Sequence, residues 1–286
     1  MSVRRPVSFR ALLARLHAPR AATKLSAHVL GTRGARFASL AVIAIAWCAA
    51  LAPLVLRGSA SHANDSPQLA HDLLQMPVQG RAPARVHRFR LHVAHLHAEV
   101  VDLRYTTPLA DALGDADLVV NGGFWGWFKS ERRVIGLLAS QGRTLSPLKA
   151  ALSGGVLYLH GGKASIVPSR RFHGPADLDL AVQCRPQLLK SGKVEPELNA
   201  RYHAARTAVC VREAGRTLDV YVTDPSGIGP SLQDLGAWLS TQGCEHALNL
   251  DGGPSTAAAF HDQGRVVRIG AGRELPYALR FTYATP

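Results

Sequence analysis

The sequence predicts an α+β fold: a single domain of antiparallel-rich mixed sheet with few helices, preceded by one N-terminal transmembrane helix. Short alternations of apolar and polar residues, typical of half-buried strands, recur from residue 86 onward. Glycine-containing turns separate several of them, and only two stretches carry helix signals. We therefore divide the chain into a basic cytoplasmic arm (1–36), a transmembrane helix or signal anchor (37–56), a linker (57–84) and one domain (85–286).

The anchor is predicted from an uncharged, mostly apolar run of 20 residues at 37–56. A helix of this length spans the roughly 30 Å hydrocarbon core of a bilayer. Because basic residues near a span stay in the cytoplasm, we expect a single-pass inner-membrane protein with a periplasmic C-terminal domain. Two alternatives stay open: a buried helix of a soluble protein, and a signal peptide cleaved near Ser61-His62-Ala63, which would make the protein secreted.

The formal net charge of +13 is concentrated in the N-terminal arm. No acidic residue precedes Asp65, whereas nine basic residues do, so the remainder carries only +4. A nucleic-acid partner is therefore not expected. An oxidising compartment permits one disulfide among Cys184, Cys210 and Cys244, and the other interpretation is that these are small buried side chains. No CxxC spacing indicates zinc or a redox dithiol.

Strands and hairpins are expected through most of the domain. A strand begins near Val86, and its alternation resumes at Val101. Three hairpins are predicted from apolar runs on either side of a turn that contains glycine. Their paired runs are 156–159 with 164–167, 209–211 with 218–222, and 258–260 with 266–267.

Two helices are expected. Thr107-Pro108 places proline in the first turn of the first helix, and Gly114 lies beyond its end. Ser231 is the predicted N-cap of the second helix, with Asp234 three residues later, and Gly243 ends it.

A short apolar strand follows each predicted helix and ends in a polar residue and two glycines. The first such motif is Asn121-Gly122-Gly123, and the second is Asn249-Leu250-Asp251-Gly252-Gly253. A strand holds the polar side chain rigidly, and glycines allow close approach of a ligand and expose backbone N–H donors. The alternative is a pair of tight turns, since Asn-Gly and Asp-Gly are common hairpin signals.

These motifs give the chain a resemblance to the phosphodiester glycosidase family. The similarity covers roughly residues 85–284 in four ordered blocks: Asn121-Gly122-Gly123-Phe124-Trp125, 181–189, 205–209 and 243–256. The family includes the enzyme that uncovers the mannose 6-phosphate signal by removing N-acetylglucosamine from a sugar phosphodiester. The usual family pattern has two aromatic residues after Asn-Gly-Gly, commonly both Phe, whereas the second is Trp125 here. The resemblance implies hydrolysis of a glycosidic bond to phosphate, with a carbohydrate phosphodiester as substrate.

Such a reaction requires a cation for the phosphate, a carboxylate near the anomeric carbon, and partners for sugar hydroxyls. Arg206 fits the first role, because guanidinium binds phosphate in a bidentate fork. Asp251 fits the second role as base or nucleophile, and Asp224 is the expected second carboxylate; a turn or cap residue before Pro225 is the other interpretation of Asp224. The predicted substrate-binding residues are Asn121, Gly122, Gly123, Trp125, Thr207, Asn249, Gly252, Gly253 and Ser255.

No cofactor or metal site is predicted, although a divalent cation stays open. His92, His95 and His97 lie close together in the sequence, but without a nearby carboxylate pair or cysteine we interpret them as a solvated strand face. The rival to the enzyme is a catalytically inactive glycan-binding or exopolysaccharide-export accessory module on the same fold, because fold does not determine function.

Overall fold

The computed structural model describes residues 69–270 and 274–283. The predicted cytoplasmic arm, the predicted transmembrane helix and the first part of the predicted linker lie outside the described residues. Within the described residues, no helix is both long and apolar enough to cross a membrane.

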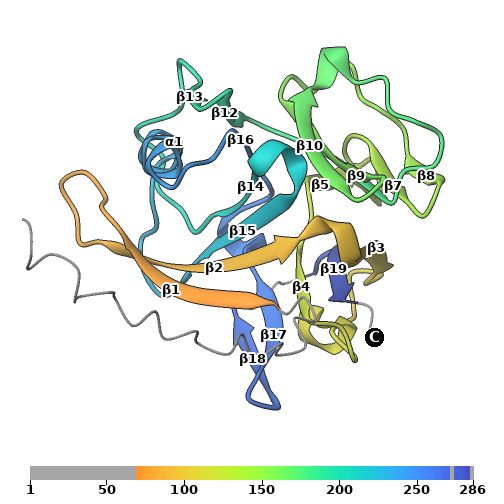
Figure 1. Cartoon of the computed structure of the whole chain (residues 1–286), viewed down its shortest axis with the longest axis horizontal. Helices are drawn as coiled ribbons and strands as arrows, with labels where there is room; N and C mark the ends of the chain where they lie inside the picture. The colour runs from red at the N-terminus through yellow and green to blue at the C-terminus, as the bar shows by residue number, and fades with distance from the viewer. Residues whose placement is uncertain (1–68, 271–273, 284–286) are drawn as a thin grey trace, which may run out of the picture. The chain divides into compact units, whose positions relative to one another are not determined.

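The largest sheet has seven strands in the order β1-β2-β15-β14-β16-β12-β13 (Figure 1). Its strands are β1 (Ala70–Met76), β2 (Ala84–His92), β12 (Gln187–Lys190), β13 (Lys193–Val194), β14 (Thr207–Arg212), β15 (Thr217–Thr223) and β16 (His246–Asn249). The linker prediction was too long, because β1 lies within 57–84 and pairs with β2 along its whole length. Because β1 contains several polar residues, the search for alternating apolar and polar residues did not predict it as a strand.

Two five-stranded sheets and one isolated hairpin complete the strands. The second sheet has the order β10-β9-β11-β7-β8, and the third has the order β18-β17-β4-β19-β3. The second is built from β7 (Leu138–Ser140), β8 (Arg143–Ser146), β9 (Gly155–His160), β10 (Lys163–Pro168) and β11 (Leu180–Cys184). The third is built from β3 (Leu96–Asp102), β4 (Leu118–Asn121), β17 (Ala258–Asp262), β18 (Arg265–Ile269) and β19 (Tyr277–Tyr283), and the hairpin from β5 (Trp125–Phe128) and β6 (Glu131–Val134).

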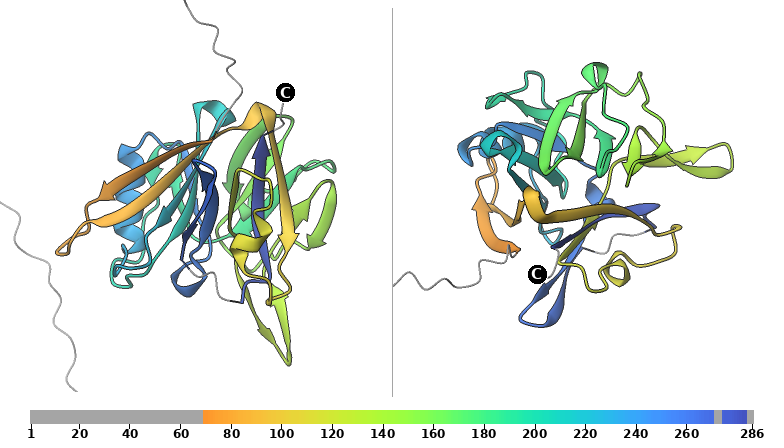
Figure 2. Two further views of the ribbon diagram at one scale, coloured as in Figure 1. Left: turned by 90° about the horizontal axis from the view of Figure 1, so that it is seen from below. Right: turned by 45° about the vertical axis from the view of Figure 1, so that its right-hand side comes forward.

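The strand pairings in the described part of the chain are all antiparallel. The expected antiparallel character is therefore confirmed, but the description of the sheet as mixed was wrong. All three predicted hairpins are present as β9–β10, β14–β15 and β17–β18. The β17–β18 hairpin extends away from the other strands (Figures 1 and 2).

One of the two expected helices forms as an α-helix. Helix α1 (Leu232–Thr241) begins at the capping box predicted from Ser231 and Asp234, with each side chain bonded to the other residue's backbone N–H. The helix expected after Pro108 is instead a single 3₁₀ turn, η2 (Leu109–Ala112). The stretch between Pro108 and Gly114, which has φ +51°, is too short for more than one turn. The other 3₁₀ segments are η1 (Val93–His95), η3 (Ser169–Arg171), η4 (Glu213–Gly215) and η5 (Gly253–Ser255).

Period-2 alternation sends the side chains of β14 into two different cores. Val209 and Val211 belong to the main core, to which strands of all three large sheets contribute. Ala208 and Cys210 point to the opposite face, where they pack with Leu235 of α1. Figure 2 shows α1 beside the seven-stranded sheet, on the side away from the second sheet. The seven-stranded sheet is therefore buried on both faces along β14, which explains its almost continuous apolar sequence.

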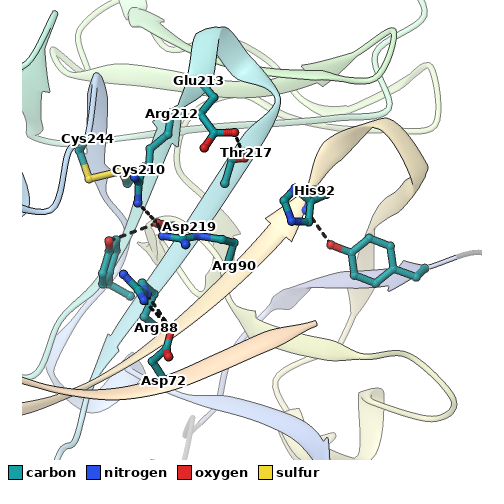
Figure 3. Close-up of polar contacts among 12 residues, drawn as sticks. Asp72, Arg88, Arg90, His92, Cys210, Arg212, Glu213, Thr217, Asp219 and Cys244 are labelled. Carbon is teal, nitrogen blue, oxygen red and sulfur yellow. Dashed lines mark hydrogen bonds and ion pairs between the residues drawn. A yellow bond between two sulfur atoms is a disulfide. The ribbon is translucent and has the colours of Figure 1, made fainter. Parts of the chain in front are cut away.

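An ion cluster and a disulfide stabilise the α1 face of this sheet (Figure 3). Asp219 is completely buried and accepts hydrogen bonds from Arg90 at 2.9 and 3.1 Å and from Arg212 at 3.3 Å. A disulfide joins Cys210 of β14 to Cys244, across 34 residues of sequence. Cys184 is the free, buried cysteine of the described region, so one pair and one thiol account for the three cysteines of the predicted exported part.

Candidate active site

The two Gly-Gly motifs meet at one place, although their strands belong to different sheets. β4 delivers Asn121 from the third sheet, and β16 delivers Asn249 from the seven-stranded sheet. The Asp251 backbone N–H donates to the Gly122 carbonyl at 3.1 Å, and the Asn121 Nδ2 donates to the Asp251 carbonyl at 2.8 Å. The two motifs are thus joined by direct hydrogen bonds across 130 residues of sequence.

Asn121 is fully buried, and its side chain is bonded to protein atoms. Its Oδ1 accepts from the Thr207 hydroxyl at 2.6 Å and from the Ala257 N–H at 3.1 Å, and its Nδ2 also donates to the Gly122 carbonyl at 3.2 Å. Thr207 is fully buried as well. The structure therefore gives Asn121 and Thr207 a positioning role, in place of the contact with sugar hydroxyls expected from the sequence.

Close packing or a left-handed backbone conformation explains the glycines of the two motifs, and several of their N–H groups already donate hydrogen bonds within the protein. A Cβ on Gly122 would lie 2.1 Å from the Tyr277 ring, and the Gly123 N–H donates to the Tyr277 hydroxyl at 2.8 Å. Gly253 has φ +61°, and its N–H donates to the Ala205 carbonyl at 2.7 Å. The Gly252 N–H donates to the Asp251 Oδ1 at 2.9 Å. The expectation that these glycines present free N–H donors to a ligand was therefore wrong for Gly123, Gly252 and Gly253.

A cavity of about 980 Å³ lies beside the second motif. Five predicted site residues line it, namely Arg206, Asn249, Asp251, Gly252 and Gly253. Ser255 is buried and does not line the cavity, although its side chain acts to lower the pKa of Asp251. Residues that sequence reasoning did not assign also line the cavity: Phe124, Arg170, Arg185, Lys190, Glu195, Glu197 and Tyr202.

Arg206 lines this cavity with a guanidinium that has no carboxylate partner. Its Nη2 donates to the Tyr202 carbonyl at 2.8 Å and its Nε to the Pro230 carbonyl at 3.4 Å. It is 7% exposed, and within the described residues it forms no ion pair. Burial lowers the pKa of Arg206 below its ordinary value, but an arginine stays protonated in proteins. A buried cation without a counter-ion is a favourable place for an anionic ligand.

Asp251 is half-buried on the same cavity. Burial raises the pKa of its carboxyl group, and hydrogen bonds from the Ser255 side chain and the Gly252 N–H oppose this shift. A partly desolvated carboxylate with one oxygen tied to the backbone is suited to act as a base or nucleophile, because its reactive oxygen is held in place and poorly solvated.

Asn249 also has an unused polar atom. Its Nδ2 donates to the carbonyls of Arg185 at 3.1 Å and Leu250 at 2.6 Å. Its Oδ1 is buried and has no hydrogen-bond partner in the described structure. Because this oxygen has almost no accessible surface, the unpaired acceptor lies inside the protein and a hydroxyl in the cavity does not contact it.

Asp224 was predicted as the second carboxylate, but the structure places it outside this cavity. It borders a separate depression with Arg85, which approaches its carboxylate to 3.7 Å. Its Oδ1 accepts from the Ser226 N–H at 2.9 Å, and this bond lowers the pKa of Asp224. Asp224 is therefore the turn residue before Pro225 that the sequence also allowed. Glu195 and Glu197 are the carboxylates that share the cavity with Asp251, and no motif in the sequence distinguished them.

Trp125 was predicted to stack on a sugar, but it does not line the cavity. It packs edge-on against Tyr105 at 5.3 Å between ring centroids, and the Arg132 guanidinium lies over both rings. The preceding aromatic residue, Phe124, lines the cavity instead. Phe124 and Trp125 are neighbours at the start of β5, where successive side chains point in opposite directions. The contact between an aromatic ring and a ligand was therefore predicted for Trp125, one residue after the residue that lines the cavity.

No group of three or more His, Cys, Asp or Glu side chains is placed to hold a metal ion in the parts of the chain that the structure describes.

One cavity of this sheet-rich domain brings together a buried arginine that forms no ion pair within the described residues and a half-buried carboxylate. The family model of the phosphodiester glycosidases matches residues 114–282. The chain therefore belongs to the phosphodiester glycosidase family, which confirms the resemblance seen in its sequence.

Solved structures show the same fold. The catalytic domain of zebrafish N-acetylglucosamine-1-phosphodiester alpha-N-acetylglucosaminidase, auto-inhibited by its pro-peptide, is similar with a TM-score of 0.58 and 14% identity, over 78% of this chain and 85% of that one. A hypothetical protein from Synechocystis matches with a TM-score of 0.59 and 14% identity, over 76% of this chain, which spans 62% of that protein. A putative exported protein from Burkholderia pseudomallei matches with a TM-score of 0.53 and 12% identity, over 70% of this chain and 74% of that one. No curated protein matches the sequence.

Proposed function

We propose that this protein hydrolyses the glycosidic bond to phosphate in a sugar-1-phosphodiester of an envelope or extracellular glycan. One observation carries the proposal: the buried guanidinium of Arg206, which no carboxylate in the described residues neutralises, lines the same cavity as the half-buried carboxylate of Asp251. Membership of the phosphodiester glycosidase family and the activity of the structurally similar zebrafish enzyme support it.

The proposed roles follow from the chemistry of the bond. Cleavage passes through an oxocarbenium-like state and releases a phosphate monoester, which is stable as an anion and needs little help from a general acid. Arg206 binds the phosphate and stabilises the negative charge that develops on it. Asp251 acts at the anomeric carbon as nucleophile or by activating water. Glu195 or Glu197 replaces Asp224 as the second carboxylate.

We also propose that the domain works on the periplasmic or extracellular side of a membrane. The basic arm and apolar run at 1–56 support export, with the run as an uncleaved anchor or a cleaved signal peptide. The Cys210–Cys244 disulfide supports it independently, because disulfides persist in oxidising compartments. A reporter that is active only in the periplasm, fused at Pro286, is expected to be active; activity of a cytoplasmic reporter at that site would reverse the topology.

The experiment that tests the activity is a turnover assay on a panel of sugar-1-phosphodiesters. Asp251→Asn should lower turnover about a thousandfold or more, because it removes the charge that acts on the reacting carbon or on water. Asp224→Asn is the matched control, since it makes the same chemical change outside the cavity and should keep normal turnover. Near-normal turnover of the Asp251→Asn variant would remove Asp251 from the mechanism.

The same assay distinguishes the rival function. An accessory module that only binds glycans would bind the panel and hydrolyse none of it. Binding without turnover in the wild-type protein would therefore replace the enzyme by the accessory module.

A further inference from the structure

A second cavity adjoins the first. It has a volume of about 430 Å³, and Pro168 and Lys190 line both cavities. Because Lys190 borders the two volumes, a ligand that extends out of the first cavity past this residue enters the second. The proposed reaction requires space for one sugar and one phosphate. This requirement does not account for the additional space of the second cavity.

The second cavity is lined by both positively charged and apolar residues. Ile166 and Val211 contribute apolar lining, while Arg171 and Lys190 contribute positive charge. Neither cation forms an ion pair in the described structure, whereas other surface arginines do: Arg88 lies 2.6 Å from Asp72, and Arg280 lies 2.6 Å from Glu99. Cations without an ion-pair partner beside apolar lining residues are suited to a sugar that carries a phosphate.

Basic residues line both cavities, together with the carboxylates of Asp251, Glu195 and Glu197 in the first and of Glu245 in the second. Arg170 lines the first cavity and its neighbour Arg171 the second, with Lys190 common to both. Arg206 adds a buried cation to the lining of the first cavity. A substrate with a single phosphate uses only part of this charge, and a chain with regularly spaced phosphates would use all of it.

We propose that the second cavity is a subsite for the next unit of an oligomeric sugar phosphate, whose additional phosphate is bound by Arg171 and Lys190. The substrate class is then a chain of sugar units joined by phosphodiesters, with hydrolysis in the first cavity and recognition in the second. The proposal rests on the function proposed above and specifies its substrate.

The experiment compares two probes: the methyl phosphodiester of N-acetylglucosamine 1-phosphate, and a two-unit oligomer of the same sugar phosphate that carries a second phosphate. Dissociation constants are measured for the full chain carrying Asp251→Asn, which prevents turnover, and KM for the chain with Asp251 intact. The wild-type site should favour the two-unit probe. Arg171→Gln should weaken the two-unit probe about tenfold and leave the one-unit probe unchanged, as expected for one lost charge-assisted hydrogen bond.

Two further variants test whether the effect depends on the sign of the charge that is removed and on its position in the protein. Glu245→Gln removes the carboxylate that lines the second cavity and keeps the oxygen that accepts from the Ala214 N–H at 3.2 Å. It should tighten binding of the two-unit probe, the opposite of Arg171→Gln. Arg268→Gln removes an exposed arginine on β18, in a different sheet, and should change neither constant.

The outcomes separate this proposal from the function itself. Equal affinity for the two probes, with no effect of Arg171→Gln, would overturn the subsite while turnover of the one-unit probe still supported the activity. A preference for the two-unit probe that is lost in Arg171→Gln supports the subsite, even if the wild-type protein hydrolysed neither probe and the proposed activity failed. An equal loss of both probes in Arg171→Gln would also overturn the subsite, because Arg171 would then act on the first cavity.

Discussion

Replacing Asn121 by Ala tests whether this residue positions the site or contacts the substrate. The substitution removes a hydrogen-bond partner from four groups: the Thr207 hydroxyl, the Ala257 N–H and the carbonyls of Asp251 and Gly122. The Gly122 carbonyl still accepts from the Asp251 N–H, so three groups lose this partner without that compensation. Each buried group left without a partner costs about 1–3 kcal/mol. Even if the surrounding structure relaxes around the substitution, the free energy of unfolding should fall by about 3 kcal/mol or more. At about 2–4 °C per kcal/mol for a domain of this size, the melting temperature should fall by about 6 °C or more.

The assay is chemical denaturation together with turnover per folded molecule. Thr207→Val is the graded control, because it removes one hydrogen bond and leaves Asn121 bonded to Ala257, and it should cost only about 1 kcal/mol. Turnover should fall in Asn121→Ala, since the Asp251 backbone loses its support, and this fall should accompany the loss of stability. An Asn121→Ala variant as stable as wild type, with only KM raised, would refute the positioning role and restore the direct contact with substrate.

Three further predictions concern charge and covalent bonds. Because burial raises the pKa of Asp251, ionisation of this group opposes folding; Asp251→Asn should therefore raise the melting temperature at pH 7, and the gain should disappear below about pH 4, where Asp251 is protonated in folded and unfolded chains alike. Burial, with the neighbouring His71 as the next cause, lowers the pKa of His87 to about 4, so the unfolded chain binds more protons than the folded one between the ordinary histidine value of 6.5 and pH 4. Stability should fall as the pH falls through this window, and His87→Gln should flatten that part of a melting-temperature profile; an unchanged profile would contradict the assignment to His87. Changing Cys210 and Cys244 together to Ser should cost roughly 2–4 kcal/mol, and addition of a reductant should destabilise the wild-type protein but not the double variant, as measured by thermal melts.

Local patterns in the sequence were enough to predict the hairpins and α1. Each of these elements depends on residues close together in the chain: the glycine turns of β9–β10 and β17–β18, or the capping box of Ser231 and Asp234. The same reasoning failed for β1, whose polar strand is held by pairing with β2, and for the 3₁₀ turn at Leu109–Ala112, where a proline and a left-handed glycine leave too few residues for a helix.

For the site, residue type and motif predicted that Asn121, Arg206 and Asp251 converge on one cavity. Arg206 and Asp251 line it, as does Asn249, whereas Asn121 does not. The motifs did not show which polar groups face the cavity and which form hydrogen bonds inside the protein instead. Asn121 and Thr207 satisfy each other because β4 and β14 bring them together across 86 residues of sequence. A hydrogen-bonding group serves a ligand only if the fold leaves it without a partner, and that depends on contacts between distant segments.

The sequence by itself determined the family, the antiparallel character of the domain and the two motifs that build the site. Only the tertiary structure decided that Asp224 belongs to a turn beside Arg85, that Phe124 rather than Trp125 lines the cavity, and that Glu195 and Glu197 join Asp251 there. The physical reason is that strand and turn signals are local, whereas a cavity is formed by segments far apart in the chain. Its charge balance and its unpaired atoms exist only after those segments have packed together.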